Sequence, residues 1–251
     1  MLSGGHKRRL STHFDAYVDV TRGDTFLNLV EVHLGRTLLL ARGSIDSSPG
    51  TKGKVADLHF SARHGRIEDI LGLFVSAPRS PMSGDLSLMT RAQLPPGDAP
   101  FLQRVKLDGR FGIDDGSFKP ETQKDVNQLS AGARGQNKDD PETVLSGLKG
   151  EFNLVEGVAN FSYLDFQVAG AHARLRGTYN VVNYRIGLHG QMRVDTQISK
   201  TSSGFKALLL KVMDPIFKKK KKGEIVPVHI LGTYEKPQFG LDLGPDQGKS
   251  K

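Results

Sequence analysis

The chain has 251 residues, of which 37% are hydrophobic and 29 are glycine, a composition that suits an open sheet with many turns better than a thick globular core. Its formal net charge is +8, but five consecutive lysines, Lys218–Lys222, supply more than half of it, which weakens the case for a general nucleic-acid-binding surface. The absence of cysteine excludes disulfides, a thiolate nucleophile and a zinc–thiolate site.

The sequence carries no recognisable membrane or export signal. No apolar run approaches the roughly 18 residues of a membrane span, and the first residues, MLSGGHKRRLSTHF, lack the apolar core of a signal peptide. We therefore expect either a cytosolic protein or the C-terminal piece of a longer chain that carries its anchor elsewhere.

Alternation of apolar and polar residues predicts five strands in the first part of the chain. They are HFDAYVDV, NLVEVHL, TLLLARGSI, KVADLHFSA and GDLSLMTRAQL. A short amphipathic helix is predicted over RIEDILGLF, because Ile67, Ile70, Leu71 and Phe74 recur at helical spacing. We expect residues 1–24 to form a leading strand or flexible lead-in.

Two further helices are predicted nearer the C-terminus. PETQKDVNQLSAGARG begins at Pro120 and ends in glycines, and the polar segment 132–144 that follows is expected to be a surface excursion. SGFKALLLKVMDPIF carries one apolar stripe and ends near Pro215, just before the lysine run. The last residues, 244–251, read as a disordered tail.

A spaced motif, apolar-x-Gly-x-aromatic, recurs along the chain. It stands in LDGRF, LKGEF, LRGTY and ILGTY, where its glycines are Gly109, Gly150, Gly177 and Gly232. All three fixed positions share one strand face, so each glycine leaves a gap in that face. Such a gap relieves crowding on a strongly curved sheet or lets another chain approach closely.

The four segments between Gly150 and Val194 each have one apolar and one polar face, which predicts a one-sided antiparallel sheet. We predict a mainly β protein: a long, curved antiparallel sheet, an open groove or half-barrel, with two or three short helices at its edge. The same alternation also fits a closed sandwich of two sheets, and periodicity alone favours that closed core. If the sheet stays open, the candidate groove residues are Phe152, Leu154, Phe166, Leu175, Tyr179, Ile186, Leu188, Met192 and Ile230.

Catalytic and metal-binding motifs are absent from the sequence, so we expect neither an enzyme nor a cofactor. Asp57 and His59 share a strand face and could form half of a metal site, although a solvated strand face is the simpler interpretation. Asp114 and Asp115 beside Gly116 could suggest calcium, but Asp-Gly in a β-turn is the commoner explanation.

The C-terminal third adds a resemblance to a known family. The succession GEFNLVEGVANFSYLDFQVAGAHARLRGTYNV and then KTSSGFKALLLKVMDPIFKKKKKGEIVPVHILGTYEKPQFGLDL resembles the C-terminal region of AsmA-like proteins. The earlier segments GRIEDILGLF, SGDLSLMTRAQLPPG and TQKDVNQLSAGARG agree in the same order, and the resemblance covers residues 25–243.

The resemblance implies a function. Such proteins are anchored in the inner membrane of Gram-negative bacteria, lie in the periplasm, and are linked to outer-membrane assembly and to phospholipid movement between membranes along a twisted β-groove. The family begins with a membrane helix and a longer β region that this chain lacks, which suggests a fragment. The resemblance implies phospholipid acyl chains and envelope proteins or membrane surfaces as partners, and carries no catalytic residue. The alternative is a scaffolding module whose apolar face is plain core.

The run Lys218, Lys219, Lys220, Lys221 and Lys222 has no aromatic residue within it and leads directly into a strand. Nucleic-acid binding would need basic residues spread over a face among aromatics, so no nucleic-acid partner is expected. We interpret the run as a solvated loop that can contact anionic head groups, worth up to about 1 kcal/mol per lysine.

Overall fold

The protein folds as one antiparallel sheet with two short helices. The computed structural model describes residues 9–47, 52–74, 80, 82–118, 143–168, 171–194, 223–233 and 237–242. The strands are β1 (Leu10–Asp19), β2 (Asp24–Leu34), β3 (Thr37–Ser47), β4 (Lys54–Arg66), β5 (Met82–Leu94), β6 (Lys106–Phe118), β7 (Thr143–Val155), β8 (Val158–Val168), β9 (Ala171–Asn180), β10 (Arg185–Val194), β11 (Ile225–Thr233) and β12 (Pro237–Leu241). The helices are α1 (Ile67–Phe74) and α2 (Phe101–Arg104).

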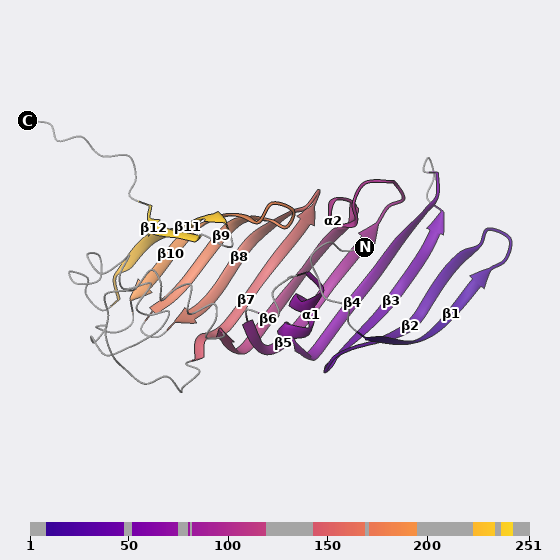
Figure 1. Cartoon of the computed structure of the whole chain (residues 1–251), viewed down its shortest axis with the longest axis horizontal. Coiled ribbons are helices and arrows are strands. Elements are labelled where there is room, and N and C mark those ends of the chain that lie inside the picture. Colours follow the sequence, from indigo (N-terminus) through magenta and orange to yellow (C-terminus); the bar gives the residue numbers. More distant parts are fainter. Residues whose placement is uncertain are drawn as a thin grey trace, which may run out of the picture.

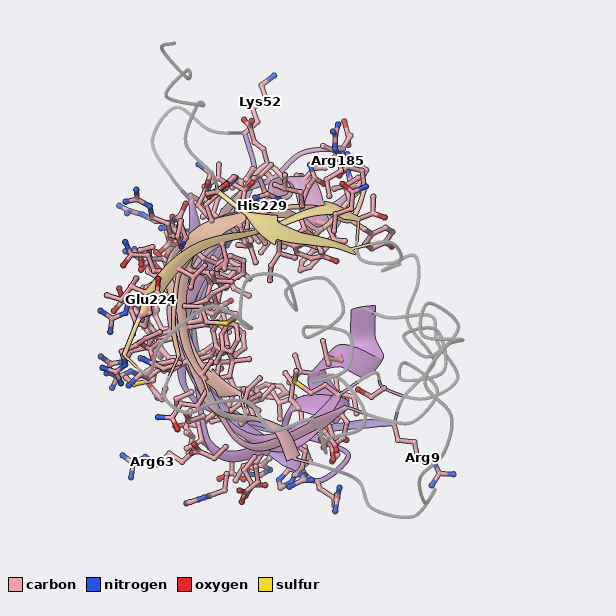
Figure 2. All side chains as sticks on the ribbon, turned by 90° about the vertical axis from the view of Figure 1, so that its left-hand side faces the viewer. Arg9, Lys52, Arg63, Arg185, Glu224 and His229 are labelled. Carbon is pink, nitrogen blue, oxygen red and sulfur yellow. The ribbon has the colours of Figure 1, made fainter. Side chains whose placement is uncertain are left out.

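The spatial order of the twelve strands is their order in the sequence, from β1 at one edge to β12 at the other (Figure 1). Viewed along its long axis, the sheet is an open C, with Arg63 and Arg185 on its outer side (Figure 2). The predicted fold class, a long, curved and open antiparallel sheet, is therefore confirmed. The two-sheet sandwich that periodicity alone favours is wrong, because the described strands form a single layer.

The strand register separates the two faces of the sheet. Residues directly opposite each other in antiparallel strands point to the same face. One row of such partners crosses the whole sheet: Phe14, Val30, Ala41, Phe60, Thr90, Gly109, Phe152, Phe161, Gly177, Leu188, Ile230 and Phe239. No residue in this row is charged. The sheet therefore has a continuous apolar face, which lies on the concave side, and a polar convex face.

The motif glycines make close packing on the apolar face possible. Gly150 lies opposite Phe111 on one side and Leu164 on the other. A Cβ atom at Gly150 would come within 2.8 Å of the Leu164 side chain and 3.1 Å of the Phe111 ring. The gap left by the glycine is thus filled by side chains of neighbouring strands, which supports the crowding explanation for the motif.

The predicted helix over 66–74 is present as α1, which lies on the concave side and packs against β4 and β5. Its first turn is tied to the turn between β2 and β3, where the Asp69 carboxylate accepts hydrogen bonds from the Arg36 backbone N–H and from the Thr37 hydroxyl, each at 2.9 Å. Glu68 pairs with Arg36 and Arg66. The acidic residues in the first turn also stabilise the helix, because their negative charge lies near the positive end of the helix dipole. No helix in the described part of the chain has the length and apolar character to cross a membrane.

The five predicted N-terminal strands are confirmed as β1 to β5, and α2 and β12 are additional elements. The turn expected at Asp115 and Gly116 is wrong, because both residues lie inside β6. Asp115 has a φ of 51° there, and the pairing of β6 with β5 shifts register at this point, which marks a bulge. The predicted helices over 120–135 and 203–217 and the lysine run lie outside the described residues, as do 132–142 of the predicted surface excursion and the tail 244–251.

Candidate functional site

The apolar concave face brings together all nine candidate groove residues. Phe152, Leu188 and Ile230 lie in the row that crosses all twelve strands. A neighbouring row holds Leu154, Tyr179 and Ile186, and the rows on the other side hold Leu175 and then Phe166 and Met192. The nine side chains therefore occupy four adjacent rows of one face, as the alternation in sequence predicts.

Part of this face is tightly packed. Leu175 is 2% exposed, and it belongs to a buried cluster that spans β8 to β11. The members of this cluster are Leu164, Ala171, Ala173, Leu175, Met192, Val226 and Val228. A second, smaller cluster contains Val105, Leu154 and Ala159, and Phe161 packs against both. Leu154, Leu175 and Met192 are thus core residues as well as members of the apolar face.

The remaining candidates keep part of their surface accessible. Phe152, Phe166, Tyr179, Ile186, Leu188 and Ile230 are half-buried. Phe60 and Leu58 continue the same half-buried surface on β4. An apolar surface that extends from β4 to β11 without a charged residue in its central row is larger than the scattered single apolar residues of an ordinary protein surface.

The convex face carries a separate groove of about 1040 Å³ that the sequence analysis does not predict. Its lining consists of residues 40–42, 59–61, 89–91, 108–110, 151–153 and 160–162, one triplet from each of β3 to β8, with Asn28 and Leu29 from β2. The middle residue of each triplet belongs to the apolar face. The nearest other residues of that face on the same strand do not line the groove. The groove therefore lies between two rows of convex-face side chains, with the backbone of the middle residues as its floor.

The walls of this convex groove are of mixed charge. Arg42, Arg91 and Arg110 lie among Asp108 and Glu151. Several of these groups already have partners within the sheet: Arg110 contacts the Met89 sulfur at 3.3 Å, and Glu151 accepts a hydrogen bond from Ser162 at 3.4 Å. The groove is consequently lined by side chains of both charges together with the apolar side chains of Leu29, Leu40 and Met89.

Asp57 and His59, the candidate half of a metal site, take part in different arrangements. The Asp57 carboxylate accepts hydrogen bonds at 2.8 Å from the Arg91 Nε and from the Gln93 side-chain amide. The Arg91 guanidinium lowers the pKa of Asp57 to about 2, and Gln93 contributes in the same direction. His59 lines the convex groove. Among the described residues, no three His, Cys, Asp or Glu side chains converge in a way that could hold a metal ion.

The Asp57–Arg91 pair predicts a small pH dependence of stability. Because the folded pKa of Asp57 is lowered, the pair contributes stability above the unfolded pKa near 3.8, and this contribution is lost as the pH falls towards about 2. Asp57→Asn should therefore lower the free energy of unfolding by less than about 1 kcal/mol at neutral pH, since the Arg91 side chain is 50% exposed and solvent screens the pair. Urea unfolding between pH 7 and pH 2 measures this, with the exposed loop variant Asp98→Asn as control. The assignment fails if both variants show the same pH dependence.

Two other clusters of charged and titratable side chains lie on the polar face. Asp165 is buried and accepts hydrogen bonds from Arg174 at 2.8 Å and 3.0 Å, with His172 also 2.8 Å away. Burial alone would raise the pKa of Asp165, but the hydrogen bonds with His172 and Arg174 together lower it below its ordinary value. Near the middle of β10 and β11, the Asp242 carboxylate lies 2.9 Å from both His189 and His229, which joins the segment after β12 to these two strands.

These features define a class of protein: a single-layer, open and curved β-sheet with an apolar concave face and a polar convex face. Comparison of the chain with protein-family models, with curated protein sequences and with solved structures finds no match. The functional argument therefore rests on the residues of the sheet itself.

Proposed function

We propose that the protein is a lipid-groove module in which phospholipid acyl chains lie along the concave apolar face. The observation that carries this proposal is the uncharged row from Phe14 to Phe239, which crosses every strand. An acyl chain has no hydrogen-bonding groups along its length. The uncharged row meets that requirement, because its one hydroxyl, on Thr90, donates a hydrogen bond to the Asp108 backbone oxygen at 3.0 Å.

The energetics of the face support the same proposal. Fully removing a large apolar side chain from water is worth roughly 1.5–3 kcal/mol, so half-buried residues such as Phe152, Leu188 and Ile230 would gain from an apolar ligand. These three residues share the apolar row, and the sheet curves into an open C around its concave side (Figure 2), so several side chains of that row can contact one acyl chain at the same time. A flat sheet would offer contact from one side only.

The wider role in this proposal follows the resemblance to AsmA-like proteins. In that role the chain is the periplasmic C-terminal part of an inner-membrane-anchored protein and serves phospholipid transport and outer-membrane biogenesis, with envelope proteins or membrane surfaces as partners. The lysines Lys218–Lys222, outside the described residues, are the proposed contact with anionic head groups. Concave-face residues, rather than catalytic ones, carry the function.

A pair of reciprocal substitutions on β10 tests lipid binding. Leu188 lies on the concave face and Gln191 on the convex face of the same strand. Leu188→Gln places a polar group in the apolar row, and we expect about tenfold less bound phospholipid, equivalent to about 1.4 kcal/mol. Native mass spectrometry and lipid extraction of the purified protein measure the bound lipid.

The matched control is Gln191→Leu, which adds an apolar side chain to the convex face and should leave bound lipid unchanged. The double variant, Leu188→Gln with Gln191→Leu, keeps the overall composition and should bind as poorly as Leu188→Gln alone. If wild-type protein purifies without lipid and melts cooperatively, the lipid proposal is wrong and the scaffolding alternative stands.

A further inference from the structure

The convex groove has two walls, and the strand register fixes the order of side chains along each. Directly opposed residues of β3 to β7 form the first wall, which consists of Arg42, His59, Arg91, Asp108 and Asn153. The same strands supply the second wall, which consists of Leu40, Ser61, Met89, Arg110 and Glu151. Neighbouring strands are about 4.8 Å apart, so a ligand in the groove meets a new pair of side chains at each such step.

The first wall places three basic side chains next to one another on β3, β4 and β5. Arg42 lies opposite His59, and His59 lies opposite Arg91. Such a row is unfavourable whenever neighbouring members are both charged, unless an anion lies against it. The Asp57 carboxylate binds Arg91, whereas Arg42 pairs with no carboxylate in the described part of the chain. The sheet therefore does not neutralise all the positive charge of this wall.

The second wall adds one guanidinium to the same region. Arg110 on β6 lies opposite Met89 on β5 and opposite Glu151 on β7. Its Nη2 atom lies 3.3 Å from the Met89 sulfur, and no ion pair among the described residues joins it to Glu151. The guanidinium is therefore turned towards β5, the strand that carries Arg91 in the first wall.

Negative charge follows in both walls. Asp108 comes after Arg91 in the first wall, and Glu151 comes after Arg110 in the second. Both carboxylates belong to exposed residues that line the groove. The groove is thus positive over β3 to β5 and negative over β6 and β7, and its sign changes over a step of about 4.8 Å.

The end of the groove nearest β2 is apolar. Leu29 and Leu40 line this end and are 44% and 38% exposed, and Met89 farther along is 53% exposed. Large apolar side chains that gather in one groove, unlike ones scattered singly over a surface, indicate contact with an apolar partner. From β2 to β7, the lining therefore changes from apolar to positive and then to negative.

We propose that the convex groove binds a zwitterionic amphiphile, whose acyl tail is followed by a phosphate and then by a primary ammonium, as in lysophosphatidylethanolamine. The tail lies at the end marked by Leu29, and the phosphate lies over β4 and β5 between Arg42 and Arg110. The ammonium lies over β6 between Asp108 and Glu151. The ethyl linker of the head group is short, so phosphate and ammonium lie on either side of the change of sign. Guanidinium–phosphate hydrogen bonds, with charge on both partners, are strong.

The negative part of the groove also predicts which head groups are bound poorly. A primary ammonium has three N–H donors for the carboxylates of Asp108 and Glu151. A choline head group has the same charge but no N–H, and a glycerol head group has no positive charge to set beside these carboxylates. We therefore expect ethanolamine to be preferred over both.

Because the chain has no tryptophan, a single introduced tryptophan reports where the ligand lies. Leu40→Trp keeps an apolar side chain in the convex groove, whereas Leu188→Trp reports on the concave face. Lysophosphatidylethanolamine with a brominated acyl chain, kept below its micelle concentration, should quench the fluorescence of Leu40→Trp in the full chain. The choline and glycerol analogues should need about tenfold more ligand. Since the two reporters lie on opposite faces, this proposal and the concave-face proposal can fail separately.

Charge variants in the Leu40→Trp background test the head-group contacts. Arg42→Gln and Arg110→Gln should each weaken binding of the ethanolamine lipid about tenfold, because each removes a charged partner of the phosphate. Glu151→Gln should weaken the ethanolamine lipid but not the glycerol lipid, which has no ammonium. Thermal melts check that each variant is folded.

Two variants that remove the same charges outside the groove serve as controls. Arg63→Gln lies on the outer side of the sheet (Figure 2), and Glu156→Gln lies in the turn between β7 and β8. Neither should change binding.

Four results would overturn the proposal. The first is a Leu40→Trp fluorescence that the brominated ethanolamine lipid does not quench. The second is binding by Arg42→Gln and Arg110→Gln as strong as binding by Arg63→Gln. The third is equal affinity for the ethanolamine, choline and glycerol lipids. The fourth is displacement of the lipid by phosphoethanolamine at an equal concentration, which would assign the groove to a soluble compound without a tail.

Discussion

Replacement of Gly177 by alanine is expected to lower the free energy of unfolding by roughly 2–6 kcal/mol. Gly177 has a φ of 136°, a conformation that costs a residue with a side chain of order 1–3 kcal/mol. A Cβ atom there would also lie 2.1 Å from the backbone oxygen of Gly187 on β10, and relieving such overpacking costs about 1–3 kcal/mol more. The backbone oxygen cannot move without disturbing the pairing of β9 with β10. Urea unfolding followed by circular dichroism measures the loss.

The control for this experiment is the glycine across the strand pair. Gly187 lies on the convex face, has no positive φ, and a Cβ there would meet only the Thr178 hydroxyl, at 3.3 Å. Gly187→Ala should change stability by at most about 1 kcal/mol in either direction. Equal losses for the two variants would mean that the motif glycine is not required by the curvature of the sheet.

Truncation of Leu175 to alanine is the second large effect, with an expected loss of about 2–5 kcal/mol. Leu175 is 2% exposed in the cluster that joins β8 to β11, and it lies opposite Leu164. The deleted methyl groups leave a cavity among side chains held by four strands, so the site can collapse only in part. A thermal melt of the variant, compared with wild type, measures the effect.

Arg176, the next residue of β9, provides the matched comparison because it points to the convex face and is exposed. Arg176→Ala should change stability by within about 0.5 kcal/mol. A comparable loss at both positions would contradict the assignment of Leu175 and Arg176 to opposite faces of a one-layer sheet.

Strand positions and faces could be predicted from the sequence where alternation is strong. The segments around Phe152, Leu175 and Leu188 alternate over several residues, and the structure places them in β7, β9 and β10 with the expected face towards the concave side. The strand β12 was not predicted, because it has five residues, of which one is proline and one glycine. The bulge at Asp115 resembles a turn in sequence, since both need a residue at positive φ beside glycine.

The openness of the sheet and the alignment of its rows could not be predicted in the same way. Alternation is identical for a strand in a sandwich and for a strand in an open sheet, so periodicity favours a closed core, whereas the described strands form a single layer. Register shifts between Phe161 and Leu164 and at Asn28 decide which side chains stand opposite one another. The convex groove is built from triplets on six strands and two residues of a seventh, and no single segment carries a signal for it.

The order of the strands has one more consequence, for how such a sheet is assembled. Each strand hydrogen-bonds only to the strands that precede and follow it in the chain. The pairing of a strand therefore does not require a segment that is distant in the sequence. Hairpins close within microseconds and can be added one after another, as in linear repeat proteins whose units touch only their neighbours. Evolution can therefore lengthen or shorten this ribbon by whole hairpins, and a polypeptide that emerges gradually from a ribosome or a translocation channel can fold in the order in which it emerges.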